Sequence, residues 1–204
     1  MRAVLLLSIL ALLASCGDTT DSFLAPEPNP ESRRDPEPRA NAEVLGGLHR
    51  ATAAFHDVEN AIAAGYAYPD AAACVEVPGI GAMGVHSLNL ALASDLEVDP
   101  LNPEVLLYLP KPGGGFRLIG VEYVVLALVL TPTGPAPWFS ESLPPYPFFN
   151  PAPSVFGQVF EGPMAGHEPG QPWHYDKHVW AWEPNPSGTF AQFNPTLSCS
   201  GAGS

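Results

Sequence analysis

EVLLYLPKPGGGFRLIGVEYVV, residues 104–125, is the stretch that decides the fold. Two apolar runs, 104–109 and 116–125, flank the glycine-rich segment 111–115, which is typical of two strands joined by a hairpin loop. The apolar run from Val121 to Leu130 is too short to span a membrane and is suited to a buried strand. A third strand is predicted over residues 175–182. Together these segments predict a mainly antiparallel sheet.

One amphipathic helix is predicted before the sheet. Apolar residues recur at helical spacing between Leu45 and Ile62, Asn41 is a suitable first cap, and Gly65 is a suitable stop. Because the apolar side chains form a single stripe, we expect the helix to pack against the sheet. The segment 66–84 is rich in turn residues. The predicted fold class is therefore α+β.

A long segment, residues 131–153, is rich in proline and aromatic residues. Structureless loops of this length are usually functional or disordered, and the aromatic side chains argue against disorder. Two roles remain open for this loop, a lid over a pocket or a static cover on one face of the sheet.

Composition limits the class of protein. The chain has 204 residues, which suits one domain, and 46% hydrophobic residues, which is enough for a core. The formal net charge is −13, from 8 basic and 21 acidic residues. A nucleic-acid partner is therefore not expected, because a phosphate backbone requires a basic surface.

The first residues have the layout of an export signal. Arg2 precedes an apolar run over residues 3–13, and Leu13-Ala-Ser-Cys16 follows. This ending resembles a bacterial lipobox, which implies that Cys16 carries lipid and becomes the mature N-terminus. We therefore expect a lipoprotein signal peptide at 1–15, a lipidated Pro-rich tether at 16–40, and one domain at 41–204, anchored to the membrane of the cell envelope. An ordinary signal peptide with an unrelated cysteine is the alternative.

Two cysteines remain, Cys74 and Cys199. Exported proteins fold in an oxidising environment, so these two are expected to form a disulfide. Two free buried thiols are the alternative.

The candidate chemistry lies in the histidines. In a strand, His174, Asp176 and His178 would share one face. His86 follows a glycine-rich turn, and Glu122 is an acid within an apolar strand, where a buried charge requires a partner. Imidazole with carboxylate suits zinc, copper or iron. We predict one metal site built by the three histidines with Glu122 or Asp176, the alternative being histidines that hydrogen-bond to the backbone.

Several familiar sites are absent from the sequence. It contains no HExxH, no GxSxG and no CxxCH, and no distant histidine follows His174-x-Asp176. His167 lies in a Pro/Gly-rich loop, where a solvent-facing position is expected.

A wider resemblance covers roughly residues 50–199. It is carried by GAMGVH (81–86), PEVLLY (103–108), GVEYVV (120–125), HYDKHVW (174–180), NPSG (185–188) and the segment from Asn194-Pro to Cys199. These strings resemble a family of exported bacterial proteins without an assigned activity. The resemblance implies a single domain and no particular reaction.

Three functions stay open on the sequence alone. The first is a transition-metal site of undefined reaction. The second is a non-catalytic binding module with an aromatic pocket formed by Trp138, Tyr123, Trp180 and Trp182. The third is a structural lipoprotein of the envelope. Neither an enzymatic reaction nor a small-molecule partner follows from the residues.

Overall fold

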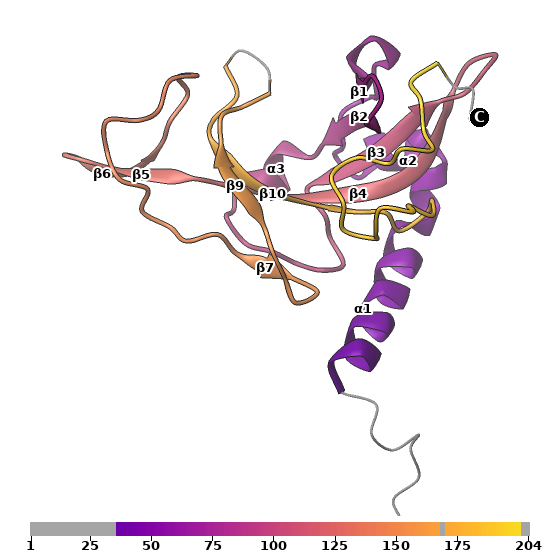
Figure 1. Ribbon diagram of the computed structural model, residues 1–204, viewed down its shortest axis with the longest axis horizontal. Coiled ribbons are helices and arrows are strands. Elements are labelled where there is room, and N and C mark those ends of the chain that lie inside the picture. Colours follow the sequence, from indigo (N-terminus) through magenta and orange to yellow (C-terminus); the bar gives the residue numbers. More distant parts are fainter. Residues whose placement is uncertain (1–35, 168–169, 201–204) are drawn as a thin grey trace, which may run out of the picture. The chain divides into compact units, whose positions relative to one another are not determined.

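The computed structural model describes residues 36–167 and 170–200 (Figure 1). The predicted signal peptide, Cys16 and most of the predicted tether lie outside the described residues. Helical segments are α1 (Pro36–Thr52), η2 (Ala53–His56), α2 (Val58–Ala63), η3 (Ala71–Ala73) and α3 (Leu90–Ala93). Strands are β1 (Val75–Val77), β2 (Gly81–Leu88), β3 (Val105–Pro110), β4 (Phe116–Leu126), β5 (Leu128–Thr131), β6 (Gly134–Pro137), β7 (Ser154–Val155), β8 (Gln158–Val159), β9 (Glu161–Met164) and β10 (His174–Val179).

The main sheet has the strand order β1-β2-β3-β4-β10-β9, and every pairing in it is antiparallel. β5 pairs with β6, and β7 pairs with β8, as separate two-stranded ladders. The described residues therefore form a curled antiparallel sheet with a few short helices, a combination that fits an α+β or a mainly β protein.

The predicted hairpin is confirmed as β3 and β4. Pro110 pairs with Phe116, and the loop is closed by the Lys111 N–H, which donates to the Gly115 carbonyl at 2.9 Å. Gly113 and Gly114 have φ of +87° and +104°, a backbone region that residues with a Cβ rarely adopt. The third predicted strand is confirmed in part, as β10, which ends at Val179 rather than at residue 182.

The prediction of one continuous helix is wrong. The chain is helical from Pro36, five residues before the predicted cap, and the helix breaks after Thr52 into η2 and α2. The break is set at Asp57, whose backbone is extended and whose side chain caps α2 by accepting a hydrogen bond from the Glu59 N–H. Apolar periodicity continues across the break, so the sequence pattern does not reveal it.

β2 occupies part of the segment in which only turns were predicted. Gly81 and Gly84 lie within this strand, with φ of +129° and +93°. A Cβ at Gly81 would lie 2.2 Å from the Asn194 carbonyl oxygen, because Ala82 forms a bridge with Asn194 at this point. Gly81 therefore allows the C-terminal segment to approach the strand closely, and Gly84 allows a close approach of Tyr108 in β3.

The apolar run 121–130 is not one strand. β4 ends at Leu126, and β5 starts at Leu128 in a different ladder. The Asn150 side chain bridges the turn, donating to the Leu126 carbonyl and accepting from the Leu128 N–H. Part of the long aromatic loop is thus attached to the turn that joins β4 and β5.

The main sheet has a core on each face. α1 and α2 contribute Leu48 and Ala61 to the larger core, which also contains Tyr108 and Tyr123. The smaller core lies on the other face and contains Val105, Leu107, Trp180 and Leu197, with both disulfide cysteines packed against it.

A disulfide joins Cys74 to Cys199, with Cα atoms 5.8 Å apart and a sequence separation of 125. The predicted pairing is confirmed. It attaches the end of the described chain to the start of β1, beside the smaller core. Within the described residues, none of the helices has the length and apolar character needed to cross a membrane.

Candidate metal centre

The pairing of β4 with β10 brings the first two candidate ligands together. Glu122 and His178 are direct cross-strand partners, so their side chains point to the same face of the sheet. Glu122 also pairs with Val105 of β3, and Leu107 of the same strand pairs with His86 of β2. His86, Glu122 and His178 therefore lie on the face that carries the smaller core.

The three side chains form a compact group. The His86 Nε2 lies 3.5 Å from Glu122 Oε2, and the His178 Nε2 lies 3.8 Å from Glu122 Oε1. Their ligand atoms all lie within 4.8 Å of one another. Donor atoms bound to zinc at ~2.0–2.2 Å are roughly 3.3–3.6 Å apart at tetrahedral angles. The observed separations thus match a set of metal ligands more closely than a set of hydrogen bonds.

The ring nitrogens are oriented for ligation. Within the described residues, the Nε2 atoms of His86 and His178 are buried and have no hydrogen-bond partner. The His86 ring also interacts with the Gly84 backbone as a hydrogen-bond donor, and because Nε2 has no such partner within the described residues, this contact is assigned to Nδ1. Metal-binding histidines typically donate their second ring nitrogen in this way.

A second group lies beside the first. It consists of His167, His174 and Asp176, whose ligand atoms also lie within 4.8 Å of one another. His174 Nε2 is 4.0 Å from Asp176 Oδ2, and His174 Nδ1 lies 3.1 Å from the Pro172 carbonyl, to which it donates when protonated. The imidazoles of His167 and His174 are in edge-on contact, with centroids 5.1 Å apart.

The two groups meet at their carboxyls. Glu122 and Asp176 lie at hydrogen-bonding distance from each other, and both are buried. Lys177, the neighbouring cation, is held by Glu161 at 2.5 Å. Apart from the Glu122 carboxyl, no hydrogen-bond donor to either Asp176 oxygen is present among the described residues. A buried pair of acids without such donors is costly unless a proton or a metal ion lies between them.

Burial shifts the pKa values of the two groups toward their neutral forms. Burial, and then the Asp176 carboxyl, raises the pKa of Glu122 well above its usual range. Burial likewise raises the pKa of Asp176, lowers that of His178 well below its usual range, and lowers that of His86 to about 4. Neutral imidazoles are metal ligands, and a cation would restore the ionised carboxylates.

The structure distributes the predicted ligands over two groups rather than one. His86, His178 and Glu122 belong to the first, and His174 and Asp176 belong to the second. His167 was predicted to face solvent. It is exposed, as predicted, but its imidazole also lies close enough to His174 and Asp176 to ligate a metal ion with them. His167 lies in a loop, where side chains do not alternate regularly, so the sequence does not reveal that it lies close to His174.

The four aromatic residues predicted to form a pocket do not share one site, because Tyr123, Trp138 and Trp182 belong to the larger core or pack against it and Trp180 does not. Tyr123 is in the larger core and Trp180 is in the smaller one, on opposite faces of the sheet. Trp182 contacts His49 and His56, and its indole N–H donates to Thr52. Trp138 packs against Tyr146.

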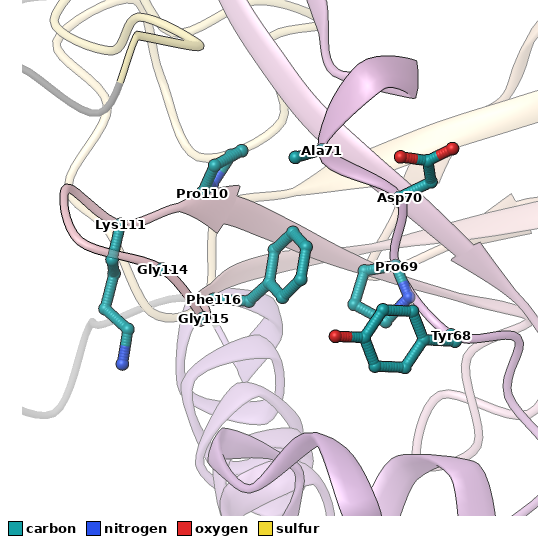
Figure 2. Close-up of a pocket in the computed structure, with 9 residues that line it drawn as sticks. All are labelled: Tyr68, Pro69, Asp70, Ala71, Pro110, Lys111, Gly114, Gly115 and Phe116. Carbon is teal, nitrogen blue, oxygen red and sulfur yellow. The ribbon is translucent and has the colours of Figure 1, made fainter.

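An open groove lies away from the histidines. Figure 2 shows Phe116 beside the hairpin loop, facing Tyr68 and Pro69. The Tyr68 and Phe116 rings are edge-on at 6.0 Å. Asp70 and Lys111 line the same groove. It contains none of the candidate metal ligands.

Comparisons with known proteins provide no relative. The chain matches no family of known proteins, no curated protein and no solved structure.

Proposed function

We propose that this protein is an exported, lipid-anchored metal-binding protein that holds a divalent transition-metal ion with His86, Glu122 and His178. The main evidence for this proposal is the geometry of these three side chains. Their ligand atoms converge within 4.8 Å, and both imidazole Nε2 atoms are buried without a hydrogen-bond partner within the described residues.

Charge and burial support an ion at this position. Glu122 is 3% exposed and lies between the two imidazoles. An isolated buried carboxylate is strongly disfavoured, and a divalent cation would compensate for it. The same cation would supply the partner that each Nε2 lacks.

The ligand chemistry selects the class of ion. Two imidazoles and one carboxylate suit zinc, iron or copper better than calcium or magnesium, which prefer oxygen ligands. Three protein ligands leave a coordination position for water or another molecule. The His86 side chain is 22% exposed, which places solvent at the edge of the group.

Export and lipid anchoring are supported by the sequence around Cys16 and by the disulfide, which is typical of oxidising compartments. The mature chain is expected to begin at Cys16, to carry acyl chains and to fractionate with membranes. Mass spectrometry of the purified protein measures this directly, and a soluble chain that retains residues 1–15 would exclude the anchor.

The test of the ion uses the full chain, purified in detergent without a histidine tag. Zn²⁺ is titrated by calorimetry into the wild type, His86→Ala and His178→Ala. We expect both variants to bind the ion of this group about 100-fold more weakly, or not at all, because each loses one of three ligands.

The matched control is His49→Ala, which removes an exposed histidine that stacks on Trp182, away from both groups. Its zinc binding should equal that of the wild type. His86→Ala and His178→Ala proteins that fold, as judged by circular dichroism, and bind zinc like this control would rule out the proposed ligands.

A further inference from the structure

We infer that His167, His174 and Asp176 bind a second divalent transition-metal ion, so that the protein holds two ions side by side. The inference extends the proposed function, on which it rests for the position of the first ion. His174 and Asp176 share a strand face with His178, because residues 174, 176 and 178 of β10 alternate with those facing the larger core.

The second group has the same donor set as the first. Each contains two imidazoles and one carboxylate, and the ligand atoms of each lie within 4.8 Å. His174 also repeats the orientation of His86. Its Nδ1 faces a backbone carbonyl two residues earlier, that of Pro172, which directs Nε2 toward Asp176. This arrangement holds the tautomer that a metal ligand requires.

Asp176 provides an independent observation. Its side chain is fully buried, at 0% exposure, and within the described residues its oxygens have no hydrogen-bond donor other than the Glu122 carboxyl. Lys177, the next residue in the strand, pairs with Glu161 instead. A buried carboxylate aimed at two imidazoles, without an N–H donor, has the surroundings of a ligand rather than those of a structural acid.

The contact between Glu122 and Asp176 links the two positions. The two carboxyls lie at hydrogen-bonding distance, and each belongs to a different group. Two carboxylates cannot donate to each other, so their closeness needs positive charge. One ion on each carboxylate provides this charge and places the two ions next to each other, as in two-metal sites. The competing arrangement is a single proton shared by the two acids.

The experiment counts ions and tests their proximity. Full-length, untagged protein in detergent is loaded with Cu²⁺ alone and dialysed, and bound copper is measured by elemental analysis. Electron paramagnetic resonance then reports whether the bound ions interact. Variants are His167→Ala for the second group, His86→Ala for the first, and His49→Ala as control. His167 and His49 are both exposed, so their substitution should leave the fold intact.

We expect two copper ions for the wild type and for His49→Ala, with a spectrum broadened by interaction between the two spins. His167→Ala and His86→Ala should each retain one ion and give the sharper spectrum of an isolated Cu²⁺. Asp176→Asn serves as a second variant of the second group, and it should also retain one ion.

Other outcomes separate the two proposals. One ion in the wild type, lost in His86→Ala and retained in His167→Ala and Asp176→Asn, would overturn the second site and leave the proposed function standing. One ion lost in His167→Ala but retained in His86→Ala would instead overturn the proposed ligands of the first ion and support the second group. Two ions without spin interaction would overturn the side-by-side arrangement, and a copper-free wild type would overturn both sites.

Discussion

Glu104 is a buried acid outside both histidine groups. It is 2% exposed, and its Oε2 accepts a hydrogen bond from the Val124 N–H at 3.0 Å. Burial raises its pKa to about 7, with smaller contributions from the acids Asp95 and Asp99, while the Val124 N–H acts in the opposite direction. Tyr66 and Tyr123 also lie close enough to interact with its charge.

This raised pKa makes stability depend on pH. Glu104 ionises near its ordinary value of 4.5 in the unfolded chain and near 7 in the folded protein. Between these values the folded state retains a proton that the unfolded state has lost, so the free energy of unfolding falls as pH rises. This loss in the free energy of unfolding is complete above pH ~7. It amounts to about 3 kcal/mol, because each unit of difference between the folded and unfolded pKa contributes ~1.4 kcal/mol.

Glu104→Gln should remove this dependence. Glutamine can still accept from the Val124 N–H but does not ionise. Urea unfolding at pH 4.5 and pH 7.5 should show the variant gaining about 3 kcal/mol relative to the wild type across this range. Glu97→Gln, at an exposed acid, controls for the loss of one negative charge. A stability difference between Glu104→Gln and wild type that stays constant with pH would contradict the assignment.

Among the elements, β2 depends most on a close backbone contact. Ala82 and Asn194 exchange hydrogen bonds at 3.0 and 3.1 Å, and the chain beyond Asn194 leads to the disulfide at Cys199. Gly81 lies against this contact, with its backbone at φ +129°. The strand that carries His86 is therefore held at its start by a segment more than a hundred residues later in sequence.

Gly81→Ala should destabilise the protein by about 1–3 kcal/mol, because the new Cβ would meet the Asn194 carbonyl at 2.2 Å. Gly79→Ala is the matched control. Gly79 also has positive φ, at +78°, but a Cβ there has no atom within 4 Å. Urea unfolding should show a clearly larger loss for Gly81→Ala. Equal losses would mean that backbone strain alone accounts for the effect and that the close approach carries no cost.

For the whole molecule, the disulfide between Cys74 and Cys199 is a covalent long-range constraint. It closes a loop of 125 residues, between the beginning and the end of the sheet-forming part of the chain. Cross-linking a loop of this length is expected to destabilise the unfolded chain by up to about 5 kcal/mol on entropic grounds.

Cys74→Ser/Cys199→Ser should therefore unfold at lower denaturant concentration than the oxidised wild type, with a loss approaching that value. Treatment of the wild type with a reductant should produce a similar loss, and the same treatment should not affect the variant. Equal midpoints for oxidised and reduced wild type would show that native contacts near Cys199 hold this end of the chain without the bond.

Local patterns predicted those features that depend on neighbours in sequence. The glycine-rich segment 111–115 predicted the hairpin, because positive φ at consecutive residues is a local property. The pairing of Cys74 with Cys199 was predicted by counting the cysteines of a chain that was expected to be exported. His174, Asp176 and His178 were placed on one strand face, because side chains alternate along any strand whatever its partners.

Only the tertiary structure decided the rest. It ended α1 at Thr52 and started α2 after Asp57, and both helices place side chains in the larger core. It made a strand of the glycine-rich segment 81–84, where Asn194 approaches Gly81 and Tyr108 approaches Gly84 closely. It also brought His86 to His178 and His167 to His174. Such groupings depend on which strands pair and in which register. Strand pairing and register are set by side-chain packing between segments far apart in sequence, and a local sequence pattern contains no information about that packing.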